Sequence, residues 1–157
     1  MNKADPQAIL NREISLTNLA VVASSAASLF SLCLFFFLID HHIVKKILGT
    51  SAIGFVVFGV IGISKFRDLI TLRRLRAELF AQEAADPRWI RLSCRQKKET
   101  LAIGRGIGVP ADATSVTIEF DMGIGAQVSH KLATKFAARF LPALFTQRPH
   151  WLALLRP

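Results

Sequence analysis

Two apolar runs near the N-terminus decide the fold of this chain: LTNLAVVASSAASLFSLCLFFFLI at residues 16–39 and ILGTSAIGFVVFGVIGI at residues 47–63. Neither run contains Asp, Glu, Lys, Arg or His, and they are 24 and 17 residues long. A helix that crosses the hydrocarbon core of a bilayer needs about 20 apolar residues, within a range of about 17–25. The two runs therefore predict a membrane protein in which residues 16–63 form a two-helix transmembrane hairpin.

The charges that flank the runs set the expected orientation. Residues 1–15 are neutral overall and residues 40–46 carry one net positive charge, so residues 64–157 hold the remaining +8 of the net +9. Short flanks rich in Lys and Arg stay in the cytoplasm. We therefore expect an integral protein of the bacterial inner membrane with residues 1–15 and the C-terminus in the cytoplasm, although Lys45 and Lys46 lie in the link on the far side.

The basic residues that follow the second run are also expected to contact anionic lipid headgroups, at about 1 kcal/mol each. They are Lys65, Arg67, Arg73, Arg74 and Arg76.

Small side chains recur along both runs at spacings that place them on one helix face. We expect Ser24 and Ser28 to pack against Gly54 and Gly62, because small residues let helix backbones approach closely in lipid. The alternative is a polar pore. Two helices cannot enclose a pore, and ion pathways usually contain buried ionisable residues, which both runs lack. The pattern favours helix packing.

The second helix is expected to continue beyond the membrane as a cytoplasmic helical extension over residues 64–86, since the sequence Asp86-Pro87 is the first stop signal. This extension carries two apolar stripes, and the tail 146–157 is apolar and aromatic. We expect both to dock on partner subunits and to be buried only in an assembly. The predicted docking residues are Leu72, Leu75, Leu79, Trp151, Leu154 and Leu155.

After Pro87 apolar and polar side chains alternate, as they do in strands. The expected strands are residues 89–94, 100–103 and 114–120. A helix is expected over residues 126–145, because apolar side chains recur every four positions from Val128 to Leu144. The predicted fold of residues 88–145 is a small α+β (β-β-β-α) cytoplasmic domain. Its core is small enough that we expect it to lean on a partner or another copy.

No pattern in the chain is typical of catalysis, of a cofactor or of a metal site. Asp40, His41 and His42 are the only local group of metal-ligand types, and adjacent histidines point to different sides of a helix or strand. We therefore expect a protein that is not an enzyme and that binds neither a cofactor nor a metal.

A glycine-rich loop over residues 104–108 is the one candidate for ligand binding. It lacks the spacing and the following helix of a dinucleotide-binding loop, so a plain loop is the simpler interpretation. In the alternative interpretation a phosphorylated ligand is bound by Arg91, Arg95, Gly104, Gly106 and Gly108. Nucleic acid is not an expected partner, because the chain has no Tyr and its 12 Phe lie mostly in apolar stripes, away from the basic residues.

The preferred functional hypothesis is a non-enzymatic inner-membrane subunit of a multiprotein complex, such as a secretion or DNA-transfer apparatus. Its hairpin would anchor a cytoplasmic docking domain, and its partners would be membrane lipids, other membrane-protein subunits or further copies of itself. The alternatives are a membrane-tethered sensor that binds a phosphorylated ligand and a pore-forming, holin-like protein.

Overall fold

The computed structural model describes residues 5–40, 45–80, 86–96, 99–102, 108–110, 112–121 and 127–156. The chain divides into two compact units. The helix unit is Ile14–Leu72, and the sheet unit combines Met1–Glu13 with Arg73–Pro157. The chain is thus rich in helix and carries one small mixed sheet.

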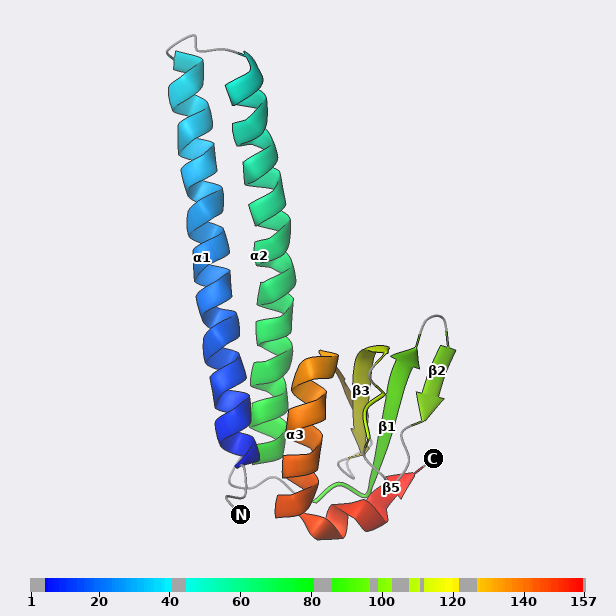
Figure 1. Ribbon diagram of the computed structural model, residues 1–157. Helices are drawn as coiled ribbons and strands as arrows, with labels where there is room; N and C mark the ends of the chain where they lie inside the picture. Colours follow the sequence, from blue (N-terminus) through cyan, green and yellow to red (C-terminus); the bar gives the residue numbers. More distant parts are fainter. Residues whose placement is uncertain are drawn as a thin grey trace. The chain divides into compact units, whose positions relative to one another are not determined.

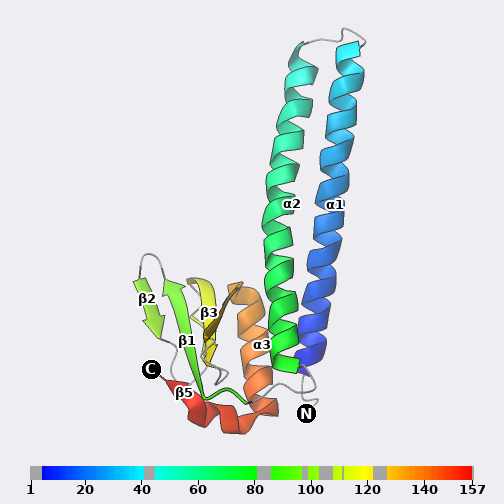
Figure 2. The same ribbon diagram turned by 180° about the vertical axis from the view of Figure 1, so that it is seen from behind.

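Two long helices contain both apolar runs. They are α1 at Pro6–Asp40 and α2 at Lys45–Phe80, and within the helix unit they lie side by side (Figures 1 and 2). α1 begins at a capped turn, where the Asp5 carboxylate accepts a hydrogen bond from the Gln7 backbone N–H at 3.0 Å. α2 continues past Ile63 without interruption to Phe80. The rest of the expected extension, residues 81–85, lies outside the described residues.

In its described residues the sheet unit contains five strands and, besides the ends of α1 and α2, one α-helix (Figure 1). The strands are β1 at Trp89–Gln96, β2 at Glu99–Ala102, β3 at Ala113–Asp121, β4 at Gln127–Leu132 and β5 at Leu155–Arg156. Their order is β2-β1-β3-β4 with antiparallel neighbours, and β5 pairs in parallel with β1. The helix α3 spans Thr134–Gln147 and is followed by a 3-10 helix, η1, at Pro149–Leu154.

The expected helix over residues 126–145 is wrong in its first third. Residues 127–132 form the strand β4, which pairs with β3 from Asp121↔Gln127 to Val116↔Leu132. His130 and Leu132 are buried while Ser129 and Lys131 are exposed, which is the two-residue period of a strand. The domain therefore has a fourth strand that the β-β-β-α prediction lacked, and α3 begins eight residues later than expected.

One face of the sheet is covered and the other is open. α3 packs against β3, and the side chains that alternate toward the covered face along β1 and β3 are buried: Ile90, Leu92, Cys94, Val116, Ile118 and Phe120. The rings of Phe136 and Phe140 on α3 stack at 5.0 Å between centroids. Leu10, Leu75 and Leu79, which α1 and α2 contribute to the same unit, are also buried.

Candidate functional site

Exposed apolar side chains are concentrated on α1 and α2. Among the described residues, every large apolar side chain that is exposed lies between Leu16 and Ile70, inside the helix unit. Leu19 and Phe30, for example, are 66% and 70% exposed. Soluble monomers rarely expose so much contiguous apolar surface. In the described part of the chain one helix, Pro6–Ile39, is long and apolar enough to cross a membrane by length and composition.

Small and polar side chains lie at the contact between α1 and α2. Ser24 and Ser28 are only 6% and 9% exposed. A methyl group built on Gly62 would lie 3.1 Å from Ser24 Oγ, and one built on Gly54 would lie 3.0 Å from Ser31 Oγ. The four predicted packing residues therefore all lie where the helices approach each other. These contacts pair earlier residues of α1 with later residues of α2, so the two helices run antiparallel.

The Ser28 hydroxyl satisfies its hydrogen-bonding capacity across this contact, since its Oγ donates to the Phe55 carbonyl oxygen at 3.2 Å. Gly59 lies opposite Ser28 and was not predicted as a packing residue. Its position three residues before Gly62 could have identified it as a packing residue, because residues three apart share a helix face.

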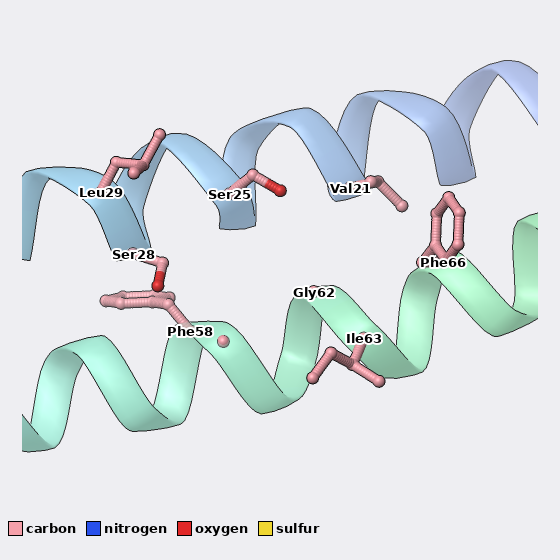
Figure 3. A pocket seen from close by; sticks show the side chains of 9 residues that line it. Val21, Ser25, Ser28, Leu29, Phe58, Gly62, Ile63 and Phe66 are labelled. Carbon is pink, nitrogen blue, oxygen red and sulfur yellow. The ribbon is translucent and has the colours of Figure 1, made fainter.

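A pocket of about 360 Å³ lies along the same contact (Figure 3). Its lining is apolar apart from two serine hydroxyls and comes from both helices: Val21, Ser25, Ser28, Leu29, Phe58, Gly59, Gly62, Ile63 and Phe66. Such a lining suits an apolar side chain or a lipid chain. No local sequence pattern indicates this pocket, because it arises from the packing of two segments about 40 positions apart.

The predicted docking residues are already buried in the isolated chain, so the expectation that only an assembly would bury them is wrong. Leu72, Leu75, Leu79 and Trp151 are 7%, 0%, 2% and 1% exposed. Leu154 and Leu155 are half-buried. The tail completes the core of its own unit: the Trp151 ring meets that of Phe120 edge-on at 6.3 Å. An apolar tail has the same composition whether it packs on its own domain or on a partner.

Polar contacts hold the tail and the end of α2 in the sheet unit. Trp151 Nε1 donates to Asp86 Oδ1 at 2.9 Å, and Arg148 donates to the Leu79 carbonyl oxygen at 2.9 Å. The Trp151 hydrogen bond, helped by His150, lowers the pKa of the Asp86 carboxyl below its ordinary value of 3.8. In addition, buried His130 of β4 bonds to Glu78 of α2.

The open face of the sheet carries the predicted arginine pair. Arg91 and Arg95 are both exposed on β1, and alternation places them on the face away from α3. Gly108 is exposed, whereas Gly104 and Gly106 lie outside the described residues. The structure adds two residues that sequence reasoning missed: the Trp89 ring lies near the guanidinium groups of both Arg91 and Arg156, and Arg156 is in register with Arg91. The two-residue strand β5, which brings Arg156 there, has no recognisable pattern of its own.

The five basic residues that were expected to contact lipid headgroups are all exposed along α2. Lys65 forms an ion pair with Asp68 at 3.6 Å. Within the described ranges no group of three His, Cys, Asp or Glu is placed to hold a metal ion. His41 and His42 fall outside those ranges.

Comparison with family models, with curated proteins and with solved structures finds no match for this chain.

Proposed function

We propose that this chain is a non-enzymatic subunit of a membrane complex in the bacterial inner membrane. α1 and α2 cross the bilayer as a hairpin and hold the sheet unit on the cytoplasmic side. One observation carries the proposal: the helix unit is inverted relative to a soluble protein. Most of its described large apolar side chains are exposed, and Ser24, Ser28, Gly54 and Gly62 lie at the helix contact.

Free energy explains why this inversion favours lipid. A large apolar side chain that stays in water forgoes about 1.5–3 kcal/mol of burial energy. Summed over the exposed side chains between Leu16 and Ile70, the burial energy forgone in water is large compared with a typical net stability of about 5–15 kcal/mol. In a bilayer the same surface is solvated by lipid tails, and close packing between small residues holds the helices together. Lipid is therefore the solvent that this surface fits.

The second span is supported by the surface of α2. Residues 47–63 contain no ionisable side chain, and Ile53, Val56 and Val60 are exposed at 65%, 59% and 62%. Lys65 and Arg67 follow this run directly, and Arg73, Arg74 and Arg76 come within the next turns. Positively charged flanks of this kind remain cytoplasmic, which supports the proposed side for the sheet unit.

The pocket between α1 and α2 supports membership in a complex. The side chains of the two helices leave its volume of about 360 Å³ empty. The small residues in its lining leave room for another helix to approach closely. An apolar side chain from a third transmembrane helix has the size and chemistry to fill it. The proposal therefore places a partner helix of another subunit, or of a second copy, against this pocket.

Reporter fusions test the topology. A reporter inserted after residue 42 should be active on the far side of the membrane, and one fused after residue 157 should be active in the cytoplasm. The chain should also resist extraction by alkaline carbonate. Two reporters on the same side, or release of the chain by carbonate, would contradict the hairpin.

A matched pair of lysine substitutions tests whether α1 itself is in lipid. Phe30 and Ala8 are both exposed on α1, but only Phe30 lies within the apolar run. Phe30→Lys should lower the inserted fraction, because a charge near the bilayer centre costs about 2.5–3.5 kcal/mol on insertion scales. Ala8→Lys should leave insertion unchanged. Equal behaviour of the two variants would exclude α1 as a span.

A further inference from the structure

Two arginine side chains converge on one tryptophan on the open face of the sheet. Arg91 Cζ lies 5.9 Å from the centroid of the Trp89 ring, and Arg156 Cζ lies 5.7 Å from it. Both distances fall within the range of cation–π attraction. The two arginines come from different strands, β1 and β5, which pair in parallel with Arg91 and Arg156 in register. Backbone pairing therefore brings the two arginines into register, and both guanidinium groups lie against the same ring.

Among the described residues, this face of the sheet carries more basic than acidic side chains. Like charges at paired positions of neighbouring strands destabilise a sheet. Glu119 and Asp121 lie in register with Arg91 and Trp89, but on β3, on the side of β1 away from β5. Among the described residues, neither guanidinium group has an ion pair with a carboxylate within 4.0 Å. Arg95 and Lys131 add further positive charge to the same exposed face.

The two guanidinium groups of Arg91 and Arg156 are suited to bind a phosphate group. A guanidinium group presents a planar fork of N–H donors that matches the oxygens of a phosphate group in two parallel hydrogen bonds. A phosphate monoester carries a charge of about −1.5 to −2 at neutral pH, which balances two guanidinium groups. The Trp89 ring limits the freedom of both side chains, and such preorganisation lowers the entropic cost of binding.

We propose that Arg91, Arg156 and Trp89 form a binding site for a phosphate monoester. This site goes beyond the anchoring function and does not depend on it. The same chemistry is offered by a lipid headgroup, such as that of phosphatidic acid, and by a soluble phosphorylated metabolite.

The experiment uses the full chain and follows the fluorescence of Trp89. In one arm the protein in nonionic detergent is titrated with glycerol phosphate, with acetate as the comparison anion. In the other arm the protein is placed in phosphatidylcholine nanodiscs with added phosphatidic acid, or with phosphatidylglycerol as a diester of similar charge. A saturable response to a monoester is expected in at least one arm, and the responding arm identifies the source. The response should vanish in Trp89→Phe, which keeps Trp151.

Matched arginine substitutions make the test specific. Arg91→Gln and Arg156→Gln should each weaken binding by about tenfold, the effect of losing a charge-assisted contact. Arg95→Gln removes the same charge from the same face of β1, four residues from Arg91, and should weaken binding much less than either of these variants, because only the general positive charge of the face is reduced. Far-ultraviolet circular dichroism confirms that each variant is folded. The proposal is overturned if no arm gives a saturable response, or if Arg95→Gln weakens binding as much as the other two.

Discussion

At the scale of single residues, the helix contact depends on the absence of side chains. Gly62 and Gly54 face serine hydroxyls at distances that leave almost no room for a Cβ atom, whereas Gly49, on the same helix, has nothing within 4 Å of its Cβ position. Glycine in a helix interior costs about 1 kcal/mol relative to alanine. Close packing of the two backbones offsets that cost at Gly54 and Gly62, but not at Gly49.

This difference predicts that one substitution lowers the stability at Gly62 but not at Gly49. Gly62→Leu should lower the thermal stability of the detergent-solubilised chain, because overpacking a tight contact costs about 1–3 kcal/mol. Gly49→Leu changes the same intrinsic helix propensity without a neighbour to displace, so its stability should be equal to that of the parent or slightly higher. Melting of both variants, followed by circular dichroism, measures the difference. A loss of the same size at both positions would mean that the Ser24–Gly62 contact does not hold the helices together.

The Asp86 carboxylate gives a second residue-scale prediction, which concerns acid stability. The Trp151 hydrogen bond and His150 hold the pKa of Asp86 below 3.8 in the folded chain, so the ionised form stabilises the fold above pH 3.8. This contribution is lost progressively as the pH falls below 3.8 through the lower folded pKa. Asp86→Asn should therefore weaken the loss of stability in that acid range, as measured by denaturant unfolding at a series of pH values.

The control for this prediction is Trp151→Phe, which removes the indole donor but keeps an aromatic ring in the core. In that background Asp86→Asn should have a smaller effect on the pH dependence. An undiminished effect would place the cause of the pKa shift elsewhere.

At the scale of elements, the sequence predicted those helices and strands whose apolar side chains recur with a spacing that fits only one type of element. Both apolar runs are helical, and β1 and β3 lie within two residues of their expected bounds. β4 was missed because Val128, Leu132 and Phe136 recur every four residues. That spacing fits one face of a helix and also fits one face of a strand, since four is a multiple of two.

The candidate site, too, could be predicted only in the part that depends on residues close together in the sequence. Arg91 and Arg95 could be named as candidates because they form a local pair, four positions apart in the sequence. Arg156 was not found, because its position depends on the pairing of a two-residue strand with β1. The docking prediction failed at Trp151 for a related reason: its partners, Asp86 and Phe120, come from distant parts of the chain.

The strand assignment of β4 predicts a distinctive labelling pattern. Single cysteines are introduced at residues 129, 130, 131 and 132 in a chain whose Cys33 and Cys94 have been replaced. Positions 129 and 131 should react quickly with a maleimide, and 130 and 132 slowly, because side chains of a strand alternate between the two faces. Parent-like circular dichroism is the control for each variant. Protection that follows a period of three to four residues would instead support a helix over this segment.

At the scale of the whole molecule, the two units differ in the solvent that their surfaces suit. All of the described large apolar side chains that are exposed belong to the helix unit, while the sheet unit buries or half-buries its own. The sheet unit is also discontinuous in sequence. Its core includes Leu10 from the start of α1 and Leu75 and Leu79 from the end of α2, so residues 88–145 are only part of the folded unit.

This division predicts that the sheet unit can be made soluble without the helix unit. A chain in which Ile14–Leu72 is replaced by a flexible Gly/Ser linker keeps every segment of the sheet unit, including the Glu13–Arg139 contact at 3.5 Å. It should be recovered from the soluble fraction as a folded protein without detergent. A chain of residues 88–157 alone lacks Leu10, Leu75 and Leu79, and should unfold at a lower temperature or associate, because its remaining core is left partly uncovered.

Leu10→Asp in the linked chain is the matched control, since it keeps every segment but places a charge at a position with 0% exposure. Its stability should fall by several kcal/mol, as expected for an unpaired charge in a core. Size-exclusion chromatography and thermal melting measure all three chains. Two outcomes would contradict the division of the molecule into a lipid-solvated and a water-solvated unit: the linked chain aggregates without detergent, or residues 88–157 melt at the same temperature as the linked chain.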